Sequence, residues 1–431
     1  MKKFKLSLLF LFIPLTALCQ LTSLGLKGIN YKSQMEIVND TLYVASFDGL
    51  YRKNMKHNSD WEQFEFKGLQ VRNFARWNDD WIASCTFSGF RKDSMLFYAP
   101  AKQDTIIDYT FFENDTAFTN SGTTALSPIF ITQQPSSRQT LYAATAIGTY
   151  KSPDFGKTWT YISQYAFEAN GLIFDPKDER IMLEYGESWI MSGIILRMND
   201  KGELLNSHEA PGGDDQISDV VFCHSNPDIA LYVSSFGKIG KSTDAGKSWE
   251  MVYGIEPNGL VTSNCMFYDI VEDTNTAGTF YASGWQHDTE DMIYIYRTKD
   301  YGETWEIAWK ENLQGEERVK VLNIIMHGDE LILQTNVGLY SLNVKTTPTL
   351  MESTTAKNKA VTITYDAESR AIYAETESPI SAITLTDAAG RIVCSVIQQN
   401  RVNAATLSDG IYLITVQTKD GESIVQKLHI K

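Results

Sequence analysis

The chain has 431 residues, of which 43% are hydrophobic and 12% aromatic, and its formal net charge at pH 7 is −15. This length is sufficient for two domains or for one large array of repeats. The acidic balance argues against binding to nucleic acid and against charge-driven binding to anionic membranes, because both of these partners are themselves negatively charged.

Residues 1–19 have the features of a signal peptide. Three lysines among the first five residues precede an apolar run from 6 to 18, and Ala17-Leu18-Cys19 before Gln20 fits a signal-peptidase site. The apolar run is too short to anchor the chain in a bilayer, and no other stretch approaches a membrane span. Lipidation of Cys19 is the alternative, disfavoured because Leu18 is bulky. We expect the mature protein to be soluble and exported.

Residues 20–346 contain one sequence pattern that occurs seven times, at intervals of about 46 residues. The pattern alternates apolar and polar residues, as in TLYAATAIGTYKS (140–152), and this alternation predicts paired β-strands. A repeat of this length predicts an all-β, seven-bladed β-propeller with one four-stranded sheet per repeat; six or eight blades are the alternatives. The last repeat ends after its third strand, so we predict that residues 21–27 supply the fourth and close the ring.

Three repeats carry the same eight-residue pattern, namely a small hydroxyl residue, any residue, Asp, any residue, Gly, any residue, a hydroxyl residue and Trp. It reads SPDFGKTW at 152–159, STDAGKSW at 242–249 and TKDYGETW at 298–305, and a degraded copy follows at 200–202. The spacing predicts a tight turn in which the Asp carboxylate accepts backbone N–H groups, the Gly takes a positive φ, and the Trp anchors the returning strand. The residues assigned to this structural role are Ser152, Asp154, Gly156, Trp159, Ser242, Asp244, Gly246, Trp249, Asp300, Gly302 and Trp305.

The pattern resembles the Asp-box (BNR-like) repeat of β-propellers in sialidases, sortilin-type receptors and several secreted glycosidases. The resemblance implies that these turns join the third and fourth strands on the bottom face, so that ligands would bind on the top face. The top-face loops combine carboxylates with aromatic side chains, as sugar-binding sites commonly do. The candidate binding residues are Asp48, Asp214, Asp215, Trp285, His287, Asp288, Glu290 and Asp291.

The sequence contains no recognised catalytic motif: it has no Gly-x-Ser-x-Gly elbow, no His-Glu-x-x-His, no P-loop and no dinucleotide fingerprint. Glycoside hydrolysis needs two carboxyl groups about 5–10 Å apart, and spacing singles out no such pair here. Sialidase activity is disfavoured, because the Arg-Ile-Pro element is absent and few arginines (Arg72, Arg76 and Arg318) could bind a substrate carboxylate. No cofactor or metal is expected; calcium near 273–275 or 214–215 is a weaker alternative.

Four cysteines remain after cleavage, and they form neither a CxxC pair nor a zinc-like pattern with histidine. Buried free thiols are the favoured interpretation. A disulfide between Cys223 and Cys265 is the alternative, and spacing does not decide between the two. The four residues are Cys85, Cys223, Cys265 and Cys394.

The C-terminal region predicts a separate domain. Residues 347–359 are polar and Thr-rich, as expected of a linker, and 360–431 contain short strands between turns, which suits a small Ig-like sandwich. Three motifs occur in order: Asp-x-x-Gly-Arg, then Leu-x-x-Gly-Ile-Tyr, then an alternating terminal strand that ends on Lys. They place candidate sorting-signal residues at Asp387, Gly390, Arg391, Gly410, Tyr412 and Lys431.

This tail resembles the C-terminal sorting domain of the type IX secretion system of Bacteroidetes; an ordinary Ig-like accessory module is the alternative. The resemblance implies passage through the periplasm, contact with the secretion machinery, export across the outer membrane and usually removal of the tail. The cargo would then be released or attached to surface lipopolysaccharide.

Three functions are compatible with these observations. The favoured hypothesis is a secreted or cell-surface propeller that binds a glycan or a protein through its top face. The alternatives are a glycoside hydrolase of the propeller endoglucanase type, and a protein-docking platform for complex assembly.

Overall fold

The computed structural model divides the chain into two compact units, residues 1–349 and 350–431. In the first unit it describes residues 21–26, 32–57, 59–86, 94–101, 105–109, 130–145, 148–163, 168–188, 192–211, 215–254, 265–286, 292–312 and 319–345. In the second it describes 362–366, 370–375, 379–387, 392–397, 399–405, 407–408, 410–419 and 423–430. The expected signal peptide and linker lie outside these ranges.

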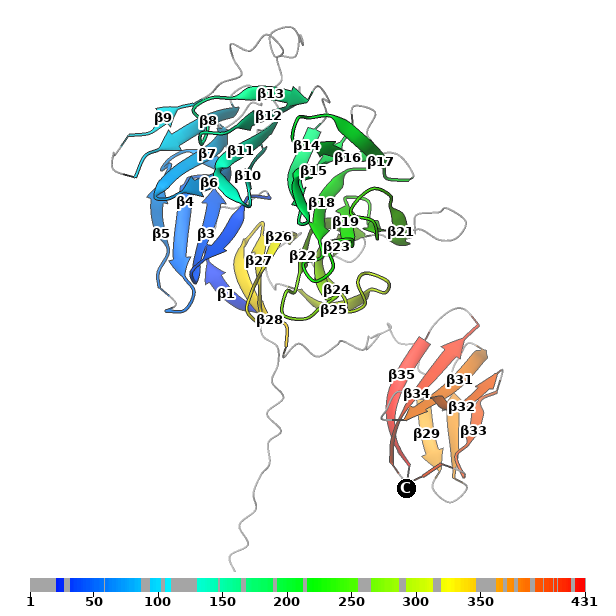
Figure 1. The fold of residues 1–431 in the computed structure, drawn as a ribbon. Coiled ribbons are helices and arrows are strands. Elements are labelled where there is room, and N and C mark those ends of the chain that lie inside the picture. Colours follow the sequence, from blue (N-terminus) through cyan, green and yellow to red (C-terminus); the bar gives the residue numbers. More distant parts are fainter. Residues whose placement is uncertain are drawn as a thin grey trace, which may run out of the picture. The chain divides into compact units, whose positions relative to one another are not determined.

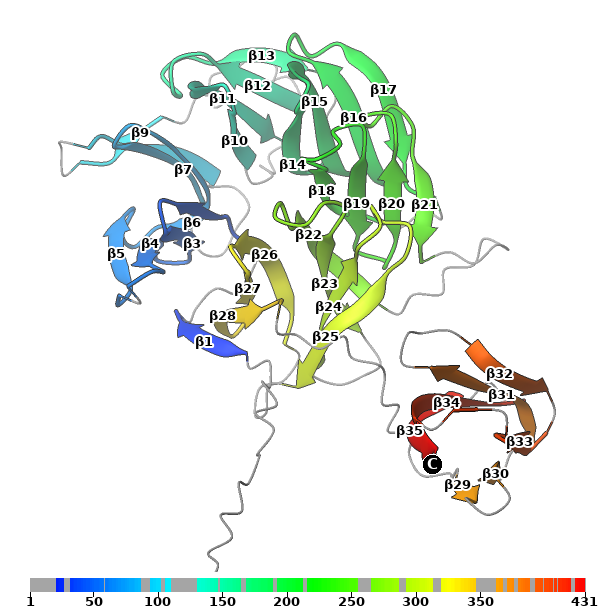
Figure 2. The same ribbon diagram turned by 60° about the horizontal axis from the view of Figure 1, so that its bottom comes forward.

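The first unit is a ring of seven four-stranded antiparallel sheets, which confirms the predicted seven-bladed β-propeller (Figures 1 and 2). Within a blade the strands follow chain order from the inner strand outward. Blade 1 is β2 (Met35–Val38), β3 (Thr41–Ser46), β4 (Gly49–Asn54) and β5 (Glu62–Glu65); blade 2 is β6 (Gln70–Trp77), β7 (Asp80–Thr86), β8 (Ser94–Ala99) and β9 (Ile107–Asp108); blade 3 is β10 (Phe130–Gln134), β11 (Ser137–Thr145), β12 (Gly148–Ser152) and β13 (Thr160–Ser163). Blade 4 is β14 (Glu168–Asp175), β15 (Asp178–Glu187), β16 (Gly193–Asn199) and β17 (Leu204–Glu209); blade 5 is β18 (Ile217–Phe222), β19 (Ala230–Ser234), β20 (Ile239–Ser242) and β21 (Glu250–Tyr253); blade 6 is β22 (Cys265–Glu272), β23 (Phe280–Gln286), β24 (Met292–Thr298) and β25 (Glu306–Asn312).

Blade 7 is closed by the N-terminal segment. It consists of β26 (Val321–His327), β27 (Glu330–Thr335), β28 (Gly338–Asn343) and, as the outer strand, β1 (Thr22–Gly25), which pairs antiparallel with β28. The indole of Trp61 donates a 2.7 Å hydrogen bond to the Leu24 carbonyl and so ties β1 to blade 1 as well. The predicted closure is confirmed, and it leaves no unpaired edge where the ring begins and ends.

The hydrophobic cores lie between neighbouring blades. One cluster joins Ile82 and Leu96 of blade 2 to Leu141 and Phe155 of blade 3. The second strand of a blade packs against a neighbour on both faces, and this is why β19 is buried along its whole length. Cys85 and Cys223 are buried free thiols, as the favoured interpretation predicted. The alternative, a disulfide between Cys223 and Cys265, is therefore wrong.

The three repeated turns have the predicted hydrogen bonds. In the first, the Asp154 carboxylate accepts the backbone N–H of Thr158 at 2.8 Å, and the Ser152 hydroxyl accepts the N–H of Gly156 at 2.8 Å. The glycines have φ of 85°, 78° and 87°. The sequence analysis missed that the residue before each glycine is also left-handed, with φ of 57° to 60° at Phe155, Ala245 and Tyr301.

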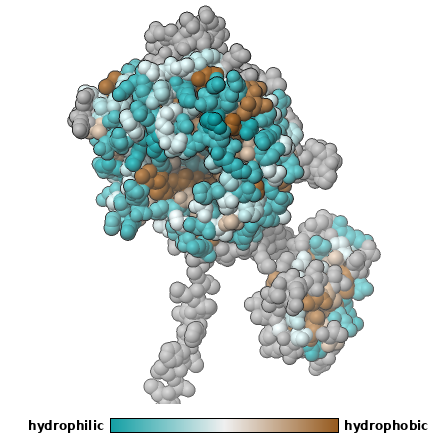
Figure 3. Space-filling view, viewed as in Figure 1, coloured by the Kyte–Doolittle hydropathy of each residue, from teal (hydrophilic) through white to brown (hydrophobic). Residues whose placement is uncertain are grey.

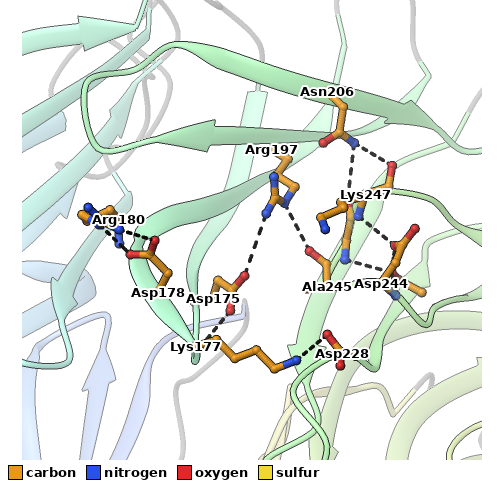
Figure 4. Close-up of polar contacts among 12 residues, drawn as sticks. Asp175, Lys177, Asp178, Arg180, Arg197, Asn206, Asp228, Asp244, Ala245 and Lys247 are labelled. Carbon is orange, nitrogen blue, oxygen red and sulfur yellow. Dashed lines mark hydrogen bonds and ion pairs between the residues drawn. The ribbon is translucent and has the colours of Figure 1, made fainter.

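Each of these turns also packs on the preceding blade, as Figure 4 shows for the turn of blade 5. From blade 4, the Arg197 guanidinium donates to the Ala245 carbonyl at 3.2 Å, and the Asn206 amide donates to the Lys247 carbonyl at 2.8 Å. In the same way Lys241 of blade 5 pairs with Glu303 in the turn of blade 6. The turns therefore connect neighbouring blades as well as strands within one blade.

We expect Gly202→Ala to destabilise the propeller far more than Gly68→Ala. Both glycines have a φ of +80°, so an alanine is strained to a similar extent at each, by about 1–2 kcal/mol. A Cβ at Gly202 would lie 1.7 Å from the Ile162 carbonyl oxygen of blade 3, whereas one at Gly68 meets nothing within 4 Å. Thermal unfolding of the two variants measures the difference, and equal melting temperatures would contradict the inter-blade contact.

The second unit is a two-sheet β-sandwich. One sheet has the order β32 (Ile392–Ile397), β31 (Ile380–Asp387), β34 (Gly410–Thr418) and β35 (Ser423–Ile430), and the other has the order β29 (Thr362–Asp366), β30 (Ala371–Glu375) and β33 (Arg401–Asn403). Their facing side chains form one core around Ile383, Leu385 and Ile414. Asp387 pairs in register with Tyr412, whereas Gly390, Arg391 and Lys431 lie outside the described residues.

Candidate functional site

A cavity of about 650 Å³ is lined by the inner strands of the blades, around the centre of the ring. Every blade contributes to its lining, through residues of or next to β2, β6, β10, β14, β18, β22 and β26. Figure 3 shows the face around the hollow as mostly hydrophilic, with hydrophobic residues gathered beside the centre. A cavity of this size is within the range that holds small-molecule ligands.

β-Bulges direct polar side chains into this cavity. Five inner strands (β6, β14, β18, β22 and β26) change register next to the residues that line it. In β22, for example, Phe267 and Asp269 pair with consecutive residues of β23, so that Tyr268 is the extra residue. A bulge re-aims the side chains around it, and Tyr268 and Asp269 both line the cavity.

The lining is polar and electrically balanced. Basic and acidic side chains are equal in number within a chain whose net charge is −15, and amides are more numerous than either. Such a surface offers many hydrogen-bond donors and acceptors without a strong charge of one sign. The basic residues are Lys32, Arg72 and Arg138, the acidic residues are Glu36, Asp219 and Asp269, and the amides are Gln34, Asn73, Gln133, Asn170, Gln216 and Asn323.

Lys32 immediately precedes blade 1, and its side chain reaches blades 5 and 6. Its ammonium group donates to the Asp269 carboxylate at 2.8 Å and to the Tyr268 carbonyl at 2.9 Å, and it lies 3.8 Å from the Asp219 carboxylate. Because it lines the cavity, 37% of its side chain remains exposed, whereas the Asp219 and Asp269 side chains are 15% and 7% exposed. One ammonium group thus pairs with two largely buried carboxyl groups.

The pKa values of this cluster are strongly shifted. Burial lowers the pKa of Lys32, but the charges of Asp219 and Asp269 outweigh burial and leave it above its ordinary value. Burial raises the pKa of Asp219, yet Lys32 and hydrogen bonds from neighbours including Tyr185 bring the net pKa below normal. Burial and the Asp219 charge raise the pKa of Asp269 well above its usual range. The two carboxyl groups therefore titrate as a coupled pair, in which Asp219 loses its proton at a lower pH than Asp269.

Several lining residues also connect one blade to the next. Asp269 accepts the backbone N–H of Ile324 at 2.6 Å, Gln34 accepts that of Phe74 at 2.7 Å, and the Asn323 amide donates to the Ser33 carbonyl at 2.7 Å. Asp219 and Asp269 lie 3.8 Å and 2.8 Å from the Lys32 ammonium, and Asp219 also accepts the Tyr185 hydroxyl at 2.6 Å and the backbone N–H of Ile270 at 3.3 Å. Their contacts are those of a structural cluster.

Three of the candidate residues predicted from the sequence are described by the structure, and they lie away from the cavity lining. Asp48 is exposed in the turn between β3 and β4, and Asp215 is buried and lies 2.9 Å from the Lys238 ammonium. Trp285 is partly buried on β23, with the Lys320 ammonium 4.7 Å from the centre of a ring. None of the three lines the cavity. The other five candidates, Asp214, His287, Asp288, Glu290 and Asp291, lie outside the described residues.

Sequence analysis missed the polar residues of the inner strands. Asp219, Asp269 and Asn323 each interrupt a strand that is otherwise largely apolar, as in VLNIIMH (321–327), and Asn73 lies in the more polar strand β6. They occur at corresponding positions of four repeats, next to the bulge. A polar residue recurring at one position of the inner strand was the signal that could have found them.

Another buried acid lies between blades 3 and 4, away from the cavity lining. Glu184 on β15 is 1% exposed, and one of its oxygens accepts the Thr149 hydroxyl at 2.5 Å. Burial raises the pKa of Glu184 to about 7. The folded protein therefore retains a proton on this group that the unfolded chain releases near pH 4.5.

We expect Glu184→Gln to stabilise the propeller above pH 7 and to flatten its pH dependence. Because the folded pKa is raised, the parent chain loses stability as the pH rises from about 4.5 to 7, by about 3 kcal/mol in all. The neutral amide does not ionise and avoids this loss. Urea unfolding at pH 5 and pH 8 measures the difference, and a parallel shift of parent and variant at both pH values would contradict the raised pKa.

Among the described residues, no group of three or more side chains is arranged to hold a metal ion, and no helix is long and apolar enough to span a membrane.

Comparison with known families identifies the C-terminal unit. Residues 357–431 match the secretion system C-terminal sorting domain. This domain indicates export of the chain by type IX secretion, to the cell surface or the medium. No curated protein sequence matched the chain.

Solved structures similar to this chain are propeller proteins of low sequence identity. PorZ, an essential surface component of the type IX secretion system of Porphyromonas gingivalis, has 15% identity and a TM-score of 0.52, with 94% of this chain and 60% of PorZ covered. The GH74 xyloglucanase of Xanthomonas campestris has 12% identity and a TM-score of 0.54, over 92% of this chain and 59% of the enzyme. YCF48 from Cyanidioschyzon merolae has 10% identity and a TM-score of 0.51, over 75% and 98%. This chain thus spans less than two thirds of PorZ and of the xyloglucanase, and the likeness concerns the fold alone.

Proposed function

We propose that this exported propeller is a non-catalytic binding protein that takes a neutral glycan at the mouth of its central cavity. The observation that carries the proposal is the lining itself, in which bulged inner strands present amides and paired charges to a space of about 650 Å³. Sugar hydroxyls both donate and accept hydrogen bonds, and an amide side chain can satisfy either need.

The electrostatics of the lining favour a neutral ligand over a charged one. Lys32 is occupied by Asp219 and Asp269, and Arg138 pairs with Glu36 at 3.1 Å. A strongly anionic or cationic ligand would have to compete with these internal partners. A neutral polyhydroxylated ligand can add hydrogen bonds without separating an ion pair.

The same contacts speak against hydrolysis. Asp219 and Asp269, two largely buried acids of the lining, lie 3.8 Å and 2.8 Å from the Lys32 ammonium, and each accepts a backbone N–H group of the next blade. Glycoside hydrolysis needs an acid and a nucleophile or base that can act on either side of the scissile bond, whereas these two carboxyl groups are engaged by contacts within the protein.

The test is a screen of the full-length chain against soluble oligosaccharides and polysaccharides that scores binding and product release separately. We expect binding without products, and we expect binding to weaken in Arg72→Ala and Asn73→Ala. Arg180→Ala is the matched control, because Arg180 is 74% exposed and pairs with Asp178 in a turn of blade 4, away from the cavity lining. Release of shorter sugars would favour the hydrolase alternative, and absence of any glycan binding would overturn the proposal.

A further inference from the structure

The turn between β19 and β20 of blade 5 presents the most exposed large hydrophobic side chain among the described residues. Phe236 is 53% exposed, whereas Phe47 in the corresponding turn of blade 1 is only partly exposed. An isolated exposed phenylalanine is in itself ordinary. What sets Phe236 apart is the structure that holds it.

The Phe236 turn is immobilised by a buried ion pair. The Lys238 ammonium lies 2.9 Å from the Asp215 carboxylate, and the two side chains are 1% and 0% exposed. The other Asp215 oxygen accepts the backbone N–H of Phe236 at 3.1 Å and the Ser235 hydroxyl at 3.3 Å. Burying two charges is costly, and an apolar pair of similar volume often stabilises a protein as well or better. The pair is therefore better explained by the backbone geometry that it imposes on this turn.

The turn is connected directly to the cavity lining. The backbone N–H of Ser235 donates to the Gln216 carbonyl at 2.9 Å, and the side chain of Gln216 lines the cavity. Gln216 in turn donates a hydrogen bond from its side chain to Asn170, another lining residue, at 3.4 Å. Phe236 thus lies one backbone contact away from the polar lining, on a rigid support.

We infer that Phe236, which lies beside the cavity lining and not in it, forms an aromatic subsite next to the central cavity, against which one sugar ring of the bound glycan stacks. The inference rests on the proposed function and assigns to it the residue that recognises the apolar face of the ligand. Sugar rings present C–H groups on one face, and an aromatic side chain on a hydrogen-bonded turn can bind such a face without reordering of the backbone. Asp215 and Lys238 are positioning residues in this scheme, since they act through the turn and do not touch the ligand.

The test measures oligosaccharide affinity by titration calorimetry with the full-length chain. The probes are cello-, xylo-, manno- and chito-oligosaccharides and xyloglucan oligosaccharides. We expect Phe236→Ala to weaken binding about tenfold, as loss of one aromatic contact predicts, and Phe236→Trp to restore it. Leu205→Ala is the matched control, because Leu205 is also an exposed hydrophobic residue, at 46%, but lies on the outer strand β17 of blade 4.

Each outcome is decisive. Loss of affinity in Phe236→Ala but not in Leu205→Ala, with unchanged melting temperature, supports the subsite. Unchanged affinity in Phe236→Ala, together with weakened binding in Arg72→Ala and Asn73→Ala, overturns the subsite and leaves the proposed function standing. Absence of binding by the parent chain to every probe overturns the proposed function, and the subsite with it.

Discussion

Replacement of Lys32 by Met should lower the free energy of unfolding of the propeller by about 3–5 kcal/mol at pH 7. The ammonium group is the only basic partner that the structure records for Asp219 and Asp269 among the described residues. Without it, two largely buried carboxyl groups face each other, and each also holds the backbone of a neighbouring blade. The loss should appear as a lower urea midpoint and a lower melting temperature.

The pH dependence of this variant identifies the cause. In the parent chain, the raised pKa of Lys32 means that its contribution is present at neutral pH and is lost only above pH 10.5. In Lys32→Met the carboxyl groups must take up protons to remain buried, so its stability should fall as the pH rises from about 5 to 8. Addition of Asp269→Asn should recover much of the loss. An equal loss at all these pH values would contradict the electrostatic explanation.

A matched control for Lys32→Met is Lys345→Met. Lys345 forms an ion pair of similar length, 2.6 Å, with Asp329, but the two side chains are 63% and 42% exposed. An exposed pair of this kind contributes about 0–1 kcal/mol. A comparable loss in both variants would show that removal of the lysine side chain, and not the buried cluster, is responsible.

The second large effect is expected for Lys238→Met, at about 3–5 kcal/mol. This change leaves the Asp215 carboxylate buried without its ammonium partner and removes a hydrogen bond to the Pro211 carbonyl. The double variant Lys238→Met with Asp215→Asn should be more stable than the single one, because no unpaired charge remains. Thermal and urea unfolding measure both.

An exposed ion pair provides the matched control for the Lys238→Met variant. Lys177 pairs with Asp228 at the surface, where the two side chains are 48% and 52% exposed, so Lys177→Met should change stability by less than about 1 kcal/mol. If the Lys238 single variant were as stable as the parent chain, the ion pair could not be what holds the Phe236 turn.

The architecture was predictable because it depends on local sequence patterns that recur in every repeat. Alternation of apolar and polar residues specifies a strand within one repeat, and seven repeats specify seven blades. The hydrogen bonds of the repeated turns were predictable for the same reason, since Asp154 bonds residues of its own turn. The closing strand β1 was predictable from the number of strands in each repeat. The last repeat lacks its outer strand, and the segment before the first repeat supplies it.

The candidate site was not predictable in the same way. Its residues come from all seven blades and meet only when the ring closes, so residues such as Lys32 and Asp269 are neighbours in space but distant in the chain. Bulges that shift the register decide which of them face the cavity. In the sequence, Asp215 could not be distinguished from the adjacent Asp214, yet its burial against Lys238 removes it from contact with solvent.

The sequence by itself determined the class of fold, the number of blades, the separate sorting domain and the form of the turns. Each of these depends on residues within one repeat or one motif. Only the tertiary structure decided the rest: the central cavity, the sharing of one ammonium by two carboxyl groups, and the rigid support of Phe236. The physical reason is that the burial and pairing of charges depend on which strands become neighbours. The periodicity of a single strand does not determine its neighbours.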